Sequence, residues 1–210
     1  MNRRVILASA SPRRRELLAR IGIAFEVLVS ESEELTAEKE PSKVVVSLAR
    51  EKARAAARLA EAAAREPAAA VRPGEAAGGG AGEEFSPTLV LGADTIVVLD
   101  GQILGKPKDA GEARRMLRGL SGRPHHVLTG VCGVYLPEGR EETFFEDTEV
   151  VVDELSDAEI EAYVASGEPF DKAGGYGIQG SFSKHVRGIT GDYFNVVGLP
   201  LHHMYKTFFS

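Results

Sequence analysis

The chain has 210 residues, of which 43% are hydrophobic and 27% charged, and its formal net charge at pH 7 is −6. This composition is that of an ordinary globular protein and excludes an intrinsically disordered one. The acidic balance argues against general binding to nucleic acid. No apolar run reaches the roughly 20 residues that a membrane span requires, and the single cysteine, Cys132, has no internal disulfide partner. We therefore expect a soluble cytoplasmic protein without nucleic-acid or membrane partners.

The first predicted elements are a short buried strand at residues 4–8 and a helix that begins at Pro12. Ser11 is the natural N-cap of this helix. Six arginines lie within the first 20 residues against one acid, Glu16. The positive end of the helix dipole and the N–H groups of its first turn favour an anion. The sequence therefore indicates a phosphate-binding turn made by Ser9, Ser11, Arg13 and Arg14, with a solvated arginine-rich helix face as the alternative.

A second strand is predicted at residues 23–29, followed by an acidic loop at 31–34 and a helix that starts near Ser42. Lys52 falls on or beside the apolar stripe of that helix, where a charge is out of pattern. Residues 66–87 are rich in alanine, glycine and proline without an apolar period, which is typical of a flexible surface insertion. We expect residues 1–210 to form one domain that carries this insertion.

The second half of the chain alternates strands and helices. Asp100-Gly101 predicts a hairpin turn, and Asp109 and Ser156 each begin a capping-box pattern that predicts a helix. Strands are predicted at residues 89–91, 96–99, 102–104, 126–136, 142–153, 184–189 and 193–197, and a last helix beyond Pro200. Crossover helices together with long hairpins favour an α/β or α+β fold around a mixed sheet.

Asp94 interrupts a run, residues 90–98, that otherwise reads as fully buried. An unpaired carboxylate there would be costly, so we expect a cation beside it, and Lys52 and Lys106 are the candidates. Gly92 suggests a bend that opens the sheet to a cleft. A structural acid that accepts from nearby backbone N–H groups is the alternative to a functional one.

A glycine-rich loop at residues 171–179 carries several polar side chains, among them Gln179, and could fold tightly against a ligand; an ordinary turn is the alternative. The adjacent pairs His125-His126 and His202-His203 have a poor spacing for metal ligation and are interpreted as surface or packing residues. Cys132 lies in an apolar run and is interpreted as a small core residue.

Five motifs occur along the chain in the order found in the Maf proteins, a family that this sequence resembles. They are Ser9-x-Ser-Pro-Arg-Arg-x-Glu-Leu-Leu18, Gly92-Ala-Asp-Thr95, Gly105-Lys-Pro107, Asp171-Lys-Ala-Gly-Gly-Tyr-Gly-Ile-Gln179 and Asn195-Val-Val-Gly-Leu-Pro200. The resemblance implies a fold related to that of the inosine triphosphate pyrophosphatases, with an elongated mixed sheet and two lobes around a cleft. It also implies a nucleoside triphosphate pyrophosphatase, which converts a triphosphate and water to a monophosphate and pyrophosphate.

The same resemblance implies a role for each site residue. Asp94 matches the family's proton acceptor, Lys52 and Lys106 match its phosphate-binding lysines, and Arg13, Thr95 and Gln179 match its substrate-discriminating residues. The expected cofactor is Mg²⁺ or Mn²⁺, held by Asp94 with Glu33. A homodimer is implied by the resemblance alone.

Gln179 bears on the choice of substrate. A neutral amide offers a donor and an acceptor to the O4 and N3–H edge of uracil or thymine, whereas a carboxylate would better suit a cationic N7-methylated guanine. We therefore expect hydrolysis of dTTP and UTP for nucleotide-pool sanitation, with CTP and modified pyrimidine nucleotides as further candidates. The alternatives are a nucleotide-binding regulator of cell division without turnover and a pyrophosphatase for N7-methyl-GTP or other modified nucleotides.

Overall fold

The computed structural model describes residues 3–30, 36–65 and 87–210. Its centre is a seven-stranded mixed sheet in the order β2-β1-β3-β5-β6-β7, with β4 paired to β3. β1 runs parallel to β2 and β3, and the other neighbours are antiparallel. The strands are β1 (Arg4–Leu7), β2 (Glu26–Val27), β3 (Thr88–Leu99), β4 (Gln102–Leu104), β5 (Pro124–Leu136), β6 (Arg140–Val152) and β7 (Val186–Thr190). The predicted mixed α/β fold is confirmed.

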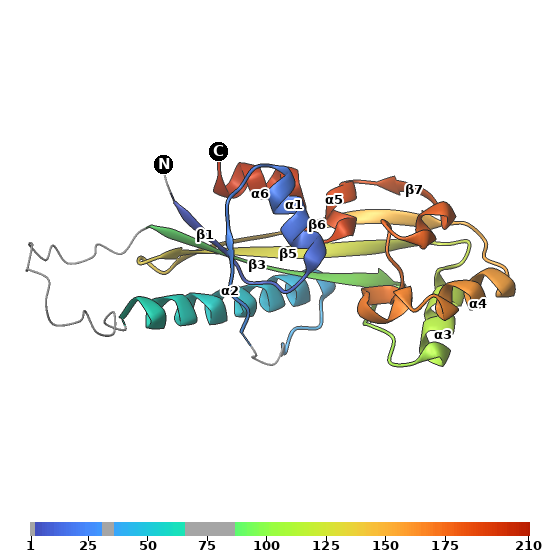
Figure 1. The fold of residues 1–210 in the computed structure, drawn as a ribbon. Coiled ribbons are helices and arrows are strands. Elements are labelled where there is room, and N and C mark those ends of the chain that lie inside the picture. The colour runs from blue at the N-terminus through green and yellow to red at the C-terminus, as the bar shows by residue number, and fades with distance from the viewer. Residues whose placement is uncertain (1–2, 31–35, 66–86) are drawn as a thin grey trace, which may run out of the picture.

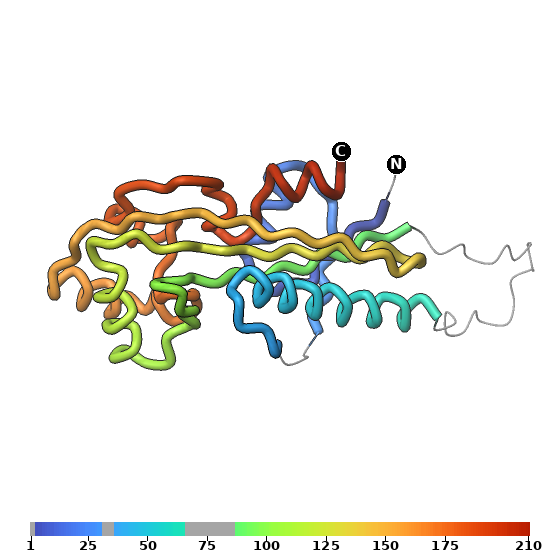
Figure 2. Tube along the Cα trace, turned by 180° about the vertical axis from the view of Figure 1, so that it is seen from behind, coloured from blue at the N-terminus to red at the C-terminus, as the bar shows by residue number. Residues whose placement is uncertain are grey.

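Helices cover both faces of this sheet, and the three long strands β3, β5 and β6 give the molecule an elongated shape (Figures 1 and 2). α2 runs along one face, α1 and α6 lie on the opposite face, and α3 and α4 lie at the far end of the long strands. The helices are α1 (Pro12–Arg20), α2 (Pro41–Arg65), α3 (Ala110–Leu120), α4 (Asp157–Ala165), α5 (Tyr193–Val197) and α6 (Leu201–Phe208), and three 3₁₀ turns are η1 (Glu168–Asp171), η2 (Ala173–Gly175) and η3 (Ser181–His185).

The alternation of side chains along β3 explains why both faces are covered. Leu89 and Leu91 point into a cluster with residues of α1 and α6, whereas Val90 between them packs with the alanines of α2. Farther along β3, Val97 belongs to a separate cluster with α3 and α4. Because successive side chains of a strand face opposite sides, a strand of this length whose residues are almost all buried requires cover on both.

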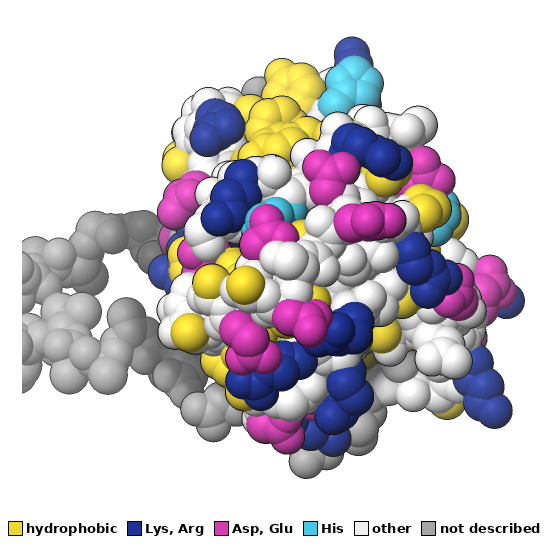
Figure 3. Space-filling view, turned by 90° about the vertical axis from the view of Figure 1, so that its right-hand side faces the viewer, with side chains coloured by type: hydrophobic (Ala, Val, Ile, Leu, Met, Phe, Trp, Pro, Cys, Tyr) yellow, Lys and Arg dark blue, Asp and Glu magenta, His cyan; other side chains and the backbone are white. Residues whose placement is uncertain are grey.

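At the α3–α4 end the two helices are joined by ion pairs between exposed side chains. Arg114 pairs with Glu161 at 2.6 Å and Arg118 with Asp157 at 2.7 Å. Figure 3 shows this end of the molecule, where basic and acidic side chains are interspersed over the surface. Each exposed pair contributes less than about 1 kcal/mol, so the apolar cluster beneath supplies most of the packing energy.

The predicted N-caps are confirmed, but the capping box predicted at Asp109 is only half formed, because Glu112 Oε2 accepts from Lys108 N rather than from Asp109 N. Ser11 caps α1, Asp109 caps α3, and Ser156 and Glu159 form a complete capping box at α4. The predicted hairpin turn at Asp100-Gly101 joins β3 to β4.

Several predicted strand boundaries are wrong. Residues 89–91 and 96–99 belong to one continuous strand, and the predicted strand at 23–29 shortens to β2. Residues 193–197 form helix α5 rather than a strand, because Asp192 caps the segment by accepting from Phe194 N at 2.7 Å and Gly198 ends it with φ +124°. The β-branched and aromatic residues of this segment predicted a strand, but the capping contacts at its two ends stabilise a helix. The strand predicted at 184–189 begins only at Val186, after η3.

Two sequence predictions lie outside the described residues. They are the acidic loop with Glu33 and, apart from Pro87, the flexible insertion at residues 66–87. Within the described ranges, no helix combines the length and the apolar character needed to cross a membrane.

Candidate active site

A cleft of about 860 Å³ opens where the first turn of α1, the middle of β3, helix α2 and the segment from η1 to Gly180 converge. Its lining includes eight of the residues singled out from the sequence, namely Ser11, Arg13, Arg14, Lys52, Asp94, Thr95, Lys106 and Gln179. Ser9 lies behind this wall, 6% exposed, and accepts a hydrogen bond from Arg14 at 3.0 Å. Glu33 lies outside the described residues. The fold therefore brings together side chains that are up to 170 positions apart in the chain.

Asp94 has the cation that its position in a buried strand requires. Lys52 Nζ lies 2.6 Å from Asp94 Oδ1, and the two side chains are 20% and 12% exposed. A partly buried charge-assisted hydrogen bond of this length is stronger than an exposed ion pair. The structure thus pairs Lys52 with Asp94, while Lys106 is exposed in the loop after β4 and lines the cleft.

Helix α2 lies unusually close to the sheet beside this pair. A Cβ on Gly92 would lie 2.7 Å from Ala53 N, and one on Gly130 would meet the backbone of Val45. The two glycines let the helix backbone approach the strands, which brings Lys52 within reach of Asp94. The expected bend at Gly92 is wrong, because β3 continues through this residue without interruption.

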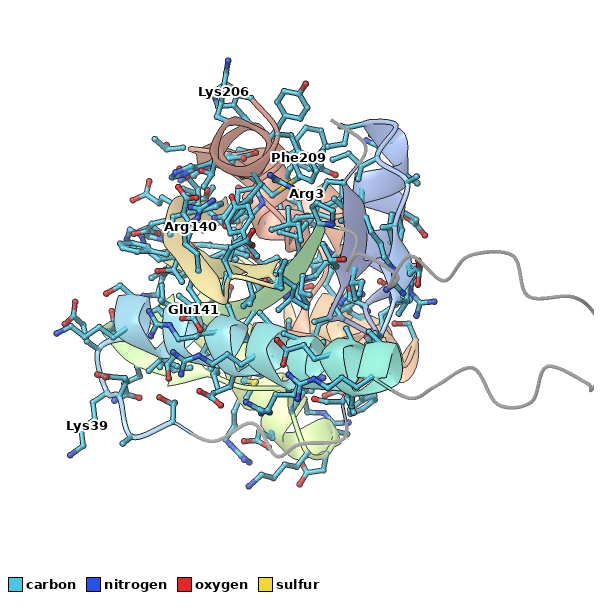
Figure 4. The ribbon with its side chains drawn as sticks, turned by 90° about the vertical axis from the view of Figure 1, so that its left-hand side faces the viewer. Arg3, Lys39, Arg140, Glu141, Lys206 and Phe209 are labelled. Carbon is cyan, nitrogen blue, oxygen red and sulfur yellow. The ribbon has the colours of Figure 1, made fainter. Side chains whose placement is uncertain are left out.

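Two arginines flank Lys52 on α2 and fix the helix against β6. Arg54 donates to both carboxylate oxygens of Glu141, and Arg50 Nε lies 3.4 Å from the same carboxylate. Figure 4 shows Glu141 directly beside this helix. A bidentate pair defines orientation as well as distance, so it holds the part of α2 that carries Lys52.

The first turn of α1 faces the cleft. Ser11 Oγ accepts from Arg14 N at 3.5 Å as the cap, and Arg13 Nη1 lies 3.4 Å from Asp171 Oδ2 across the opening. The partial positive charge of a helix N-terminus and the guanidinium of Arg13 both favour an anion at this position.

Arg14 is more buried than Arg13. It is 9% exposed, and its guanidinium donates to Gly198 O at 2.8 Å, Ser9 Oγ at 3.0 Å and Thr95 Oγ1 at 3.0 Å. These bonds join α1 to β3 and to the end of α5. The sequence suggested Arg14 as a substrate contact; in the structure its guanidinium holds the wall of the cleft together.

The glycine-rich loop forms the opposite wall and is tied down at several points. Gly174 has φ +68°, and a Cβ there would lie 2.9 Å from Val97 side-chain atoms, so the loop packs directly on β3. Tyr163 OH accepts from Gly177 N at 3.2 Å, and Tyr176 OH lies 2.6 Å from His125 Nε2 beneath the loop. These contacts fix the backbone that presents Gln179, which is exposed at the cleft.

Charges in the loop are balanced among themselves. Partial burial alone would raise the pKa of the Asp171 carboxyl, but hydrogen bonds from Lys172 and Arg13 together hold that pKa below its ordinary value. Lys172 Nζ also donates to Glu168 O at 2.7 Å. Asp171 therefore stays ionised at neutral pH, and its contact with Arg13 bridges the two walls of the cleft.

Comparison with known proteins identifies the family of the chain. Residues 4–209 match the family described as Maf-like protein. The chain belongs to the Maf-like family. A dTTP/UTP pyrophosphatase of Agathobacter rectalis is 48% identical over 205 residues, covering 96% of this chain and 94% of the relative. A dTTP/UTP pyrophosphatase of Bacillus cereus strain AH820 is 48% identical over 200 residues, covering 95% and 91%.

The sequence assigned no role to two buried polar residues behind the cleft of this Maf-like protein, Thr129 and Asn195, both 0% exposed. Thr129 lies opposite Thr95 in the β3–β5 register, and Asn195 lies on α5. Thr129 was detectable, because it interrupts the apolar run of β5 as Asp94 interrupts that of β3. Asn195 opens the last of the five sequence motifs, but its contacts could not be predicted, because residues 193–197 were interpreted as a strand.

The described part of this Maf-like chain contains no cluster of three or more histidine, cysteine or acidic side chains suited to hold a metal ion. Of the described acids that line the cleft, Asp94 is the most buried, at 8% exposed. Mg²⁺ is commonly held by one or two carboxylates together with substrate phosphates and water, so a single buried acid facing a cleft lined by Arg13, Lys52 and Lys106 fits such an ion if it arrives with a phosphate-bearing ligand.

Proposed function

We propose that this Maf-like protein hydrolyses dTTP and UTP to the monophosphate and pyrophosphate. The observation that carries the proposal is the juxtaposition of Asp94, Lys52, Lys106 and the first turn of α1 in one cleft. Support also comes from relatives named dTTP/UTP pyrophosphatase that are 48% identical over nearly the whole chain.

In the proposed reaction Asp94 accepts a proton from water. A carboxylate has about four acceptor positions, so the bond from Lys52 to Oδ1 leaves others for a water molecule. The water oxygen forms a bond to the α-phosphorus while the bond from this phosphorus to the α–β bridging oxygen breaks. Pyrophosphate leaves with the electron pair of that bond, and the proton on Asp94 passes to solvent. No covalent intermediate is required.

Lys52 has two effects in this scheme. Its charge compensates the Asp94 carboxylate within a largely buried strand, and it lies where it can offset negative charge on the phosphates. Lys106 and the N-terminus of α1 approach the cleft from other directions. Positive groups that are already in place reduce the repulsion between a triphosphate and its nucleophile without reorganising during the reaction.

A divalent ion, Mg²⁺ or Mn²⁺, completes the proposal. Asp94 would hold it, together with the phosphates and with Glu33, which lies outside the described residues. When bound, such an ion supplies charge neutralisation to the phosphate oxygens.

The base is recognised in this proposal by Arg13, Thr95 and Gln179. Gln179 is exposed at the cleft and presents an amide, which pairs with the O4 and N3–H edge of uracil or thymine. We therefore expect Gln179→Glu to lower kcat/KM for UTP and dTTP, because a carboxylate repels O4. Unchanged UTP turnover by this variant would contradict the assignment.

The decisive experiment measures pyrophosphate release with Mg²⁺ or Mn²⁺ from dTTP, UTP, CTP, GTP, ITP and N7-methyl-GTP. Asp94→Asn should keep the fold and abolish release, whereas Asp147→Asn, an exposed aspartate on β6, serves as the matched control and should behave as wild type. Selective release from dTTP and UTP supports the proposal. Release confined to another nucleotide would refute the substrate assignment, and nucleotide binding without release would favour a regulatory protein.

We further propose that the protein acts in the cytoplasm on nucleotide pools and forms a homodimer. Light scattering on the purified chain tests the dimer, and a monomeric mass at micromolar concentration would refute it.

A further inference from the structure

A chain of hydrogen bonds leads from the wall of the cleft into the interior. Arg14 Nη2 donates to Thr95 Oγ1 at 3.0 Å, Thr95 Oγ1 lies 2.9 Å from Thr129 Oγ1, and Thr129 Oγ1 bonds to Asn195 O at 3.0 Å. Thr129 and Asn195 are fully buried, whereas Thr95 is partly exposed and lines the cleft. The interior end of the chain is therefore sealed from water and its cleft end is open.

The direction of each bond follows from the atoms involved. A carbonyl oxygen only accepts, so Thr129 donates its single hydroxyl proton to Asn195 O. Thr129 then has no proton left for Thr95, and Thr95 must be the donor of the bond between the two hydroxyls. A guanidinium only donates, so Thr95 also accepts from Arg14.

These bonds leave Thr95 with one role toward a ligand. Its hydroxyl has one proton and two lone pairs; the proton points to Thr129 and one lone pair is occupied by Arg14. The remaining lone pair is the only group that Thr95 has left to offer. We propose that Thr95 is an obligate hydrogen-bond acceptor toward the substrate, and that Thr129 is the positioning residue that fixes this polarity.

The direction of the Thr95–Thr129 hydrogen bond is fixed because Asn195, at the interior end of the chain of bonds, is held in place. Asn195 is held by its own side chain, whose Nδ2 donates to Val127 O at 2.8 Å and to Thr148 Oγ1 at 2.9 Å. The start of α5 is also bound to β6, since Asp192 N donates to Thr148 Oγ1 at 3.0 Å. Reversing the Thr95–Thr129 bond would take the Thr129 proton away from Asn195 O. That oxygen would then keep only the N–H of Gly198, which it shares with Phe194 O, in a dry interior, and this loss is unfavourable.

An obligate acceptor selects a substrate with a donor at that point. Resting on the proposed function, the donors that dTTP and UTP share are the N3–H of the base and the 3′-hydroxyl of the sugar. Cytosine has an unprotonated N3, so it would place a lone pair against that of Thr95. A site built for a hydrogen bond discriminates more strongly against an analogue that cannot make it than an apolar pocket does against an analogue that differs by one methylene.

The test uses Thr129→Val, which keeps the side-chain shape and removes the hydroxyl, and Thr129→Ser as the matched control that keeps it. Steady-state kcat/KM is measured for dTTP, for dCTP, which lacks the N3 proton, and for 3′-deoxythymidine triphosphate, which lacks the sugar donor. Thermal melting of each variant checks that it is folded.

In Thr129→Val the Thr95 proton is released and Thr95 can donate into the cleft. We expect the preference of Thr129→Val for dTTP over one of the two analogues to be lower than that of the wild type by about tenfold or more. Thr129→Ser should keep the wild-type preference. If the preference for dTTP over dCTP falls, the substrate donor is the N3–H of the base. If the preference for dTTP over the 3′-deoxy nucleotide falls, the donor is the sugar hydroxyl. A merely structural role for Thr129 would lower kcat/KM for all three nucleotides equally.

Two results would overturn the inference. One is a folded Thr129→Val protein with both preferences unchanged, while the wild type hydrolyses dTTP. If Thr129→Val does not fold, Thr95→Val is measured in its place. The second overturning result is then a folded Thr95→Val protein that keeps the wild-type preferences. A wild-type protein that does not hydrolyse dTTP or UTP would instead refute the proposed function itself, and the assignment of Thr95 with it.

Discussion

Gly92→Ala is the substitution that best tests how the sheet positions the lysine of the active site. The new Cβ would lie 2.7 Å from Ala53 N and 2.9 Å from Ala53 Cβ, whereas ordinary contacts begin at 3.4 Å. The new Cβ would come still closer to Ala49 O, so helix α2 must move away from β3 by more than the roughly 0.7 Å that Ala53 N alone requires. Lys52 directly precedes Ala53, so the movement lengthens the 2.6 Å bond between Lys52 Nζ and Asp94 Oδ1.

Both stability and activity should respond. Overpacking of a core contact costs about 1–3 kcal/mol of unfolding free energy, and a displacement of about 1 Å at a catalytic group lowers rates by up to about 10²-fold. We expect a lower melting temperature and a decrease in kcat/KM for dTTP of at least about tenfold.

The matched control is Gly188→Ala on β7, where a new Cβ would meet no atom within 4 Å. It should keep wild-type stability and turnover. Gly92→Ala with wild-type kcat/KM would refute the reasoning, and a loss of stability without a loss of activity would show that the Lys52–Asp94 distance does not limit the reaction.

Three further predictions concern other parts of the site and core. Arg14→Lys should lower kcat/KM by roughly tenfold, because an ammonium cannot bind three separate acceptors with the geometry of a guanidinium. Arg15→Lys, on the exposed side of α1, is the control and should leave kcat/KM unchanged. Equal kinetics for the two variants would contradict the role of Arg14. Burial lowers the pKa of His125 from its ordinary 6.5 to about 4. As the pH falls, the unfolded state therefore takes up a proton on this histidine before the folded state does. The free energy of unfolding should accordingly decrease by up to about 3 kcal/mol between about pH 6.5 and pH 4. Urea unfolding at several pH values measures that slope, which should flatten in His125→Gln. Burial raises the pKa of the Cys132 thiol to about 12, so a thiol reagent should label Cys132 only as urea unfolds the protein, and rapid labelling of the native state would show that the thiol is accessible.

Local rules in the sequence determined the helices and turns. Ser11, Asp109 and Ser156 each satisfy the first N–H groups of a helix, a requirement that depends only on neighbouring residues, and all three caps were predicted correctly. Asp94 was also identified from its surroundings in the chain, since a carboxylate in an otherwise apolar strand needs a partner.

The tertiary structure decided what lies beside what. Residues 193–197 have strand-like composition and form a helix, because Asp192 and Gly198 bind its two ends and Asn195 then points into the β5–β6 interior. Gly92 was expected to bend a strand and instead admits a helix backbone, a contact made by residues about 40 positions away. Thr129 acquires its role only through Asn195 and Thr95, which lie 66 and 34 positions from it. A sequence pattern reports the solvent exposure and backbone preference of each residue, whereas the direction of a buried hydrogen bond depends on partners that only the folded chain supplies.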